Sequence, residues 1–246
     1  MENATHRDEK PAHAEALRRH LLIAGTLRRQ ANADAAAARD RLRLREWQAT
    51  RLARSYAHLL ASKRFGQAAR FFLSDLYGPK DFSSRDEEIE RILPLLIATL
   101  PASALLAMAL ALEVDALTES LDAAMVLELR AAGRLDGIDC IDDDAYARAY
   151  RAVGRRPERL HQIALIRETG EALERLARKP LLTAVLKLMR GPAHLAGLGE
   201  LHAFLEKGFD AFRRLGDASE FLDCIEGKER QLLENLFGDA ARPFDL

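Results

Sequence analysis

Apolar residues recur three to five positions apart along most of the chain, with charged residues between them. One such stripe extends from Leu44 to Leu60, and another covers the segment 193–214. This spacing gives an α-helix one apolar face and one polar face. Ala, Leu and Arg are abundant, and no alternating run is convincing enough to predict a β-strand. The pattern therefore predicts an all-α, multi-helix, bundle-like single domain.

The N-terminal part of the pattern predicts one long helix. It begins at Ala12, after a tail of residues 1–11 that we expect to be mobile, and it continues to about Lys63. The arginines on its second half are Arg39, Arg41, Arg43, Arg45, Arg51 and Arg54. We interpret them as a solvated helix face. A helix of this length can project and pair with another chain.

The most apolar run, Ile92–Leu112, contains no charged residue and reaches the length of about 20 residues that spans a bilayer. Pro94 and Pro101 each remove an amide donor and predict short helical pieces with a bend at residues 99–101. A broken backbone is costly in lipid but not in a protein core. We therefore expect no membrane span and a buried central helix at Ala102–Leu112.

The segment before this run carries a resemblance. Its pattern FFLxxLYGxxDxxxRD, from Phe71 to Asp86, resembles a segment of a family of uncharacterised bacterial all-helical proteins. The resemblance covers a small part of the chain. It implies a bacterial origin, and it implies no activity and no functional residue.

Charge is distributed unevenly, although the net charge is only −1. Residues 1–80 contain 16 basic and 8 acidic side chains, whereas residues 81–144 contain 4 basic and 15 acidic ones. The basic third can contact nucleic acid, or it can pair with the acidic middle inside the molecule. Internal pairing is favoured because the basic residues share a helix with an apolar face. Nucleic-acid binding through the arginine-rich helix remains an alternative, although no recognisable motif accompanies it.

The compartment is predicted from two weak signals. Cys140 and Cys224 lie far apart and have no metal-ligand spacing, which favours a reduced chain. The first residues are polar and lack the apolar stretch of a secretory signal. Both signals predict a cytoplasmic protein.

Two patterns suggest metal binding, and neither is complete. The acidic loop 133–144 lacks the spacing and the terminal Glu of a helix-loop-helix calcium site. We expect Asp142 or its neighbours to cap the next helix, and the loop is a possible boundary between subdomains. Glu158 and His161 form one E-x-x-H pair, but a di-iron bundle needs two such pairs. We predict a surface pair there, no metal site and no cofactor.

The segment 193–214 is unusual because glycines interrupt its helical pattern, among them Gly208. Since an interior glycine costs up to about 1 kcal/mol relative to alanine, we expect another helix or a flat ligand to approach closely. His202 in this segment could ligate a haem or a metal. A hydrogen-bonded structural role is the favoured interpretation.

These observations name no reaction, and no catalytic residue is assigned. The leading hypothesis is a non-enzymatic module that binds proteins and self-associates through the N-terminal helix. The rival is a pocket protein, or an enzyme, that holds a small apolar or flat ligand such as a lipid or haem. Its candidate ligand-binding residues are Tyr77, Asp81, Arg85, Asp86 and His202.

Overall fold

The computed structural model describes residues 2–76, 83–136 and 140–245, apart from the side chains of 2–8, 75, 76, 180, 181 and 183. These residues form eleven α-helices and one π-helical turn, and no strand occurs among them. In chain order the elements are α1 (Glu2–Asn32), α2 (Ala35–Ser55), α3 (Ala57–Ala61), α4 (Gly66–Phe71), η1 (Phe72–Leu76), α5 (Ser83–Thr99), α6 (Ala102–Ala131), α7 (Asp143–Val153), α8 (Arg156–Ala177), α9 (Pro180–Leu195), α10 (Gly199–Leu215) and α11 (Ser219–Phe237). The predicted all-α single domain is confirmed.

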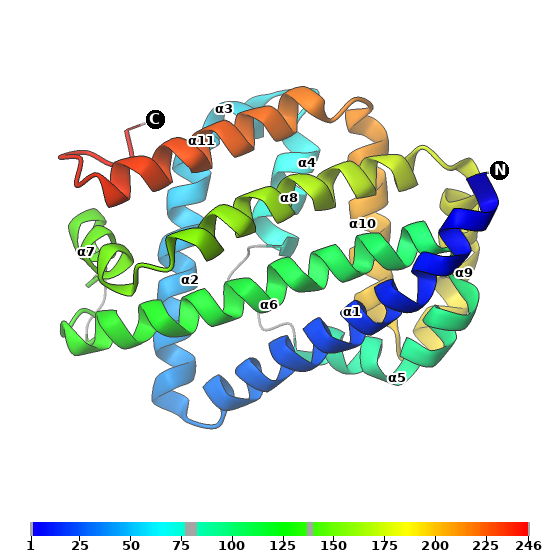
Figure 1. Ribbon diagram of the computed structural model, residues 1–246, viewed down its shortest axis with the longest axis horizontal. Coiled ribbons are helices and arrows are strands. Elements are labelled where there is room, and N and C mark those ends of the chain that lie inside the picture. Colours follow the sequence, from blue (N-terminus) through cyan, green and yellow to red (C-terminus); the bar gives the residue numbers. More distant parts are fainter. Residues whose placement is uncertain (1, 77–82, 137–139, 246) are drawn as a thin grey trace.

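Helix α6 is the axis of the fold. Helices α1 and α8 pack along it on either side, and α11 packs on the far side of α8, so that the four helices form one layer (Figure 1). Helices α2 and α10 cross behind this layer, and both contact it. The space between the crossing helices and the front layer is where the candidate site lies.

The first half of α6 is buried, as predicted for Ala102–Leu112. Leu105 is fully buried and packs in one apolar cluster with Leu17 and Leu21 of α1. The predicted bend is also present, because α5 ends at Thr99 and α6 begins directly after Pro101. The helix then continues to Ala131. In the described part of the chain, no helix is both long enough and apolar enough to cross a bilayer.

The prediction of one helix from Ala12 to Lys63 is wrong. Helix α1 ends at Asn32, and the Asp34 carboxylate accepts hydrogen bonds from the amides of Ala36 and Ala37, at 3.2 and 3.1 Å. This N-cap starts a new helix in a new direction. The structure includes residues 2–11 in α1, while their mobility and the domain limits stay predictions.

The prediction of a solvated arginine face on α2 is also wrong for half of its members. Arg41, Arg45 and Arg51 are buried, with 7–8% of each residue exposed. Arg39 and Arg54 are exposed as expected. The three buried arginines face carboxylates on α6 and α11, which makes their burial tolerable.

Candidate functional site

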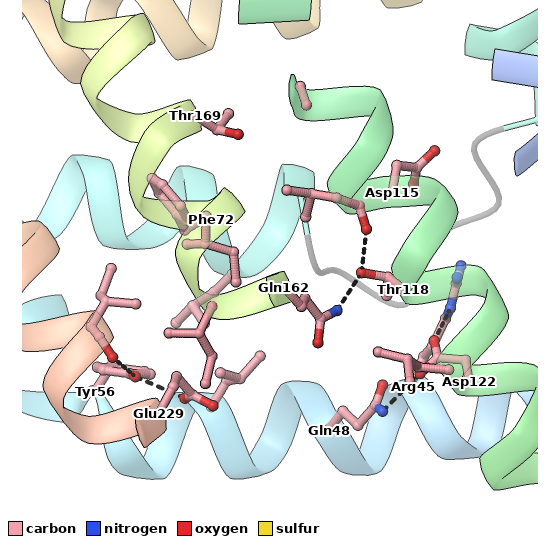
Figure 2. A pocket seen from close by; sticks show the side chains of 18 of the residues that line it. Arg45, Gln48, Tyr56, Phe72, Asp115, Thr118, Asp122, Gln162, Thr169 and Glu229 are labelled. Carbon is pink, nitrogen blue, oxygen red and sulfur yellow. Dashed lines mark hydrogen bonds and ion pairs between the residues drawn. The ribbon is translucent and has the colours of Figure 1, made fainter. Parts of the chain in front are cut away.

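A cavity of about 210 Å³ lies inside the bundle between α2, α6, α8 and α11, and it extends toward α7 at one end and α10 at the other. Apolar side chains such as Leu52, Met108 and Phe221 form most of its wall. Polar side chains form the rest of the wall (Figure 2). The cavity therefore combines an apolar interior with a few placed hydrogen-bonding groups, as small-molecule sites do.

One face of α8 contributes a mixed stripe to this wall. Arg159, Gln162, Ile163, Ile166 and Thr169 recur three to four residues apart and all line the cavity. Sequence reasoning missed the polar members of this stripe. The sequence feature that could have identified them is their position on the same helical face as the two isoleucines.

Gln162 is held in place across the gap between α8 and α6. Its Nε2 donates to Thr118 Oγ1 at 2.7 Å, and the Thr118 hydroxyl donates to the Val114 carbonyl at 2.7 Å (Figure 2). The side-chain carbonyl of Gln162 receives no hydrogen bond from a described residue. It is consequently an acceptor available to a molecule in the cavity.

Buried charges of opposite sign meet beside the cavity. Asp115, Glu119 and Asp122 are spaced four and three residues apart, which puts their carboxylates on one face of α6. Arg45 donates from Nη2 to Glu119 at 2.6 Å and from Nε to Asp122 at 3.3 Å. Burial alone would lower the pKa of Arg45, but these carboxylates outweigh it and raise the pKa above its usual value.

Arg28 of α1 enters the same network from the other side and has only 1% of its surface exposed. It pairs with Asp86 of α5 and with Asp115, and its Nε lies 2.9 Å from Glu119 without the alignment of a hydrogen bond. Arg41 Nη1 lies 3.4 Å from the other oxygen of Glu119. These contacts confirm the internal pairing of the basic N-terminal third with the acidic middle of the chain.

A second ion pair, which is partly buried, joins α2 to α11. Arg51 Nη1 donates to Glu229 Oε1 at 2.7 Å. The Tyr56 hydroxyl donates to the same oxygen at 2.8 Å, as Figure 2 shows. Burial, followed by the Glu229 charge, raises the pKa of Tyr56. Tyr56 therefore stays a neutral donor, and its position at the wall gives the site hydrogen-bonding capacity rather than a nucleophile.

Arg159 differs from these arginines. It is 94% buried, because only 6% of the residue is exposed, and its guanidinium carbon stands 3.7 Å from the centre of the Tyr150 ring. Among the described residues, its Nε and Nη2 have no hydrogen-bond acceptor, and no carboxylate lies within ion-pair distance of it. It lines the cavity.

Of the five predicted site residues, two lie in this region. Arg85 lines the cavity with Nη2 3.6 Å from Asp115, and burial lowers its pKa, against the opposing effect of Asp115. Asp86 is buried behind it. Tyr77 and Asp81 lie outside the described residues. Their roles as ligand contacts stay predictions.

His202 is placed differently. It is buried, its Nε2 lies 2.8 Å from the Leu186 carbonyl, and it does not line the cavity. The structure thus gives it the hydrogen bond expected of a structural histidine. Helix α10 instead reaches the cavity through neighbouring apolar residues such as Phe204. Gly208 allows the close approach that its position predicted, since a Cβ there would stand 2.8 Å from the Phe71 ring.

The two incomplete metal patterns serve other purposes. Asp142 caps α7 by accepting a hydrogen bond from the Ala145 amide at 2.6 Å, as predicted. Glu158 pairs with Arg155, and His161 Nε2 lies 3.1 Å from Glu113 instead. Among the described residues, no three His, Cys, Asp or Glu side chains are arranged to hold a metal ion.

Comparison with known proteins gives one match. No curated protein and no solved structure matches the chain. A family model described as a domain of unknown function (DUF8198) matches residues 27–243, which include every residue of the cavity wall. The chain therefore belongs to this family of proteins of unknown function.

Proposed function

We propose that the protein binds a small, mostly apolar molecule in the cavity between α2, α6, α8 and α11. The supporting observation is the cavity itself, with a volume of about 210 Å³. Protein interiors are close-packed and contain few voids larger than a water molecule. At about 24 cal/mol per Å³, an empty void of this size would cost roughly 5 kcal/mol, which is comparable to the whole stability of some domains.

The volume limits the size of the guest. An engineered cavity of about 150 Å³ binds benzene, so this one accommodates a molecule of roughly eight to ten non-hydrogen atoms. A haem is several times larger. The cavity therefore favours a short-chain or single-ring compound among the ligands considered from the sequence.

Self-association through the N-terminal helix has less support. Leu17 and Leu21 of α1 are buried against α6, so this part of the apolar face of the helix is already covered. Leu22 and Ile23 stay exposed on the outer side of α1 and are the residues through which a second copy would dock. Nucleic-acid binding is weakened in the same way, because Arg41, Arg45 and Arg51 are occupied by buried carboxylates.

The test is a pair of alanine-to-leucine variants on one helix. Ala111 lines the cavity, whereas Ala123 is exposed on α6. We expect 1-octanol to raise the melting temperature of wild type and of Ala123→Leu, and to have little effect on Ala111→Leu, whose side chain occupies the guest's space. Native mass spectrometry of the same samples would detect any molecule that co-purifies. An equal response of both variants, or no response of wild type, would contradict the proposal.

A further inference from the structure

We propose that Arg159 binds the negative charge of an anionic guest, so that the ligand is a monoanion with a short apolar body, such as a medium-chain carboxylate. This inference rests on the cavity binding proposed above and adds the chemical class of the ligand. Its basis is that, in the part of the chain that the structure describes, the carboxylates around the cavity leave one buried arginine without an ion-pair partner.

The buried arginines in and behind the cavity wall are Arg28, Arg41, Arg45, Arg51, Arg85 and Arg159. The carboxylates among them are Asp86, Asp115, Glu119, Asp122 and Glu229. Every arginine except Arg159 has one of these carboxylates within ion-pair distance. Glu158, the neighbour of Arg159 in sequence, is bound to Arg155. The described residues thus leave one positive charge uncompensated.

An uncompensated guanidinium cannot escape its cost by losing a proton. Transfer of an isolated charge out of water is costly, and lysine or histidine in that position would become neutral. Arginine stays protonated in proteins. A bound anion would compensate the charge, which gives the guest a strong reason to place its own charge beside Arg159.

The geometry also suits a carboxylate. The guanidinium lies over the Tyr150 ring, and Nε and Nη2, which form one edge of its fork, both lack an acceptor among the described residues. Two parallel N–H groups on one edge match the two oxygens of a carboxylate. Burial raises the pKa of Tyr150, so its hydroxyl remains protonated and is a further donor at the cavity wall.

The surrounding carboxylates restrict the charge of the guest. Asp122 and Glu229 also line the cavity, so a dianion such as a phosphate monoester would meet stronger repulsion than a monoanion does. With the volume limit of about ten non-hydrogen atoms, octanoate is a suitable probe. The alcohol 1-octanol has the same chain length without the charge, and it serves as the matched neutral probe.

The experiment measures the binding of octanoate and 1-octanol by calorimetry to wild type, Arg159→Met and Arg156→Met. Arg156 is on the same helix, but it is exposed and paired with Glu234, so it controls for the general loss of an arginine. We expect octanoate to bind Arg159→Met about tenfold to a hundredfold more weakly than wild type, as loss of a charge-assisted contact implies. Binding of 1-octanol should be unchanged in Arg156→Met, and in Arg159→Met it should change far less than the binding of octanoate does.

The outcomes separate this inference from the proposed function. Equal octanoate affinity in wild type and Arg159→Met would overturn the role of Arg159 while leaving cavity binding intact. If wild type binds 1-octanol but not octanoate, the anionic class is wrong and the cavity proposal stands. If wild type binds neither probe, the proposed function is wrong, and the inference that rests on it is wrong as well. Should Arg159→Met fold poorly, Arg159→Lys retains the charge without the planar fork, and octanoate binding should then be reduced rather than lost.

Discussion

Arg45 and Arg159 are buried to nearly the same extent, with 7% and 6% of each residue exposed, and both line the same cavity. They differ in their partners. Arg45 donates to two carboxylates of α6, whereas Arg159 lies over an aromatic ring and finds no acceptor among the described residues for one edge of its fork. Burial alone therefore does not indicate what a charged side chain does. The partners decide whether its charge holds helices together or is available to a ligand.

The two environments arise from different elements. The α6 carboxylates at positions 115, 119 and 122 face α1 and α2, whose arginines cancel their charge. The α8 stripe places Arg159 among apolar residues and amides instead. The first arrangement fastens α1 and α2 to α6, and the second leaves the far wall of the cavity positively charged.

Substitution of Arg45 should give the largest loss of stability among the tests of this comparison between Arg45 and Arg159. Arg45→Met would leave Glu119 and Asp122 buried without their closest cation, and loss of one partner of a buried pair typically costs about 3–5 kcal/mol. We expect the free energy of unfolding in urea to fall by that amount. A loss below about 1 kcal/mol would show that the remaining arginines compensate fully.

The same substitution at Arg159 should have a much smaller effect on the unliganded protein. Arg159→Met removes an uncompensated charge, which is favourable, and a stacking contact with Tyr150, worth about 2 kcal/mol when desolvated. We therefore expect the free energy of unfolding to stay within about 1 kcal/mol of wild type or to increase. A loss as large as that of Arg45→Met would mean that the two arginines are equivalent and that Arg159 is structural.

The sequence predicted much of the fold and of the paired region. Apolar spacing gave the helices, and Pro101 gave the bend before α6. The opposite charges of the N-terminal third and the middle of the chain indicated their pairing. What the spacing could not supply was the break after Asn32, because the run of alanines that follows Asp34 is equally compatible with one continuous helix.

The cavity could not be predicted in the same way. Its volume depends on how far α2, α8 and α11 stand from α6, and no local pattern encodes that distance. The sequence analysis named Arg85, which lies in a motif that extends into α5, as a candidate ligand-binding residue. It did not name Arg159, which also lines the cavity. From sequence alone, an arginine near the start of a helix is expected to lie at the surface. Only the packing of the neighbouring helices shows that it is buried. The absence of a partner becomes visible only when all neighbouring charges are placed.

A buried histidine adds a third case to the comparison, because it can lose its charge. His20 of α1 is buried, with Nε2 3.6 Å from Glu113 and 3.3 Å from the Arg19 guanidinium. Burial lowers its pKa below the ordinary 6.5, Glu113 opposes this and Arg19 adds to it. His20 is thus neutral in the fold at neutral pH.

The unfolded chain binds a proton at His20 more readily than the folded chain does. The contribution of His20 therefore destabilises the fold as pH falls below 6.5, and it levels off once pH is below the folded pKa. Urea unfolding at about pH 8 and about pH 5 would measure this. We expect His20→Gln to lose less stability than wild type over that interval. The difference between the two proteins cancels the contributions of the groups that they share. A steeper loss in the variant would mean that Glu113 dominates and that His20 is a paired cation, like Arg45.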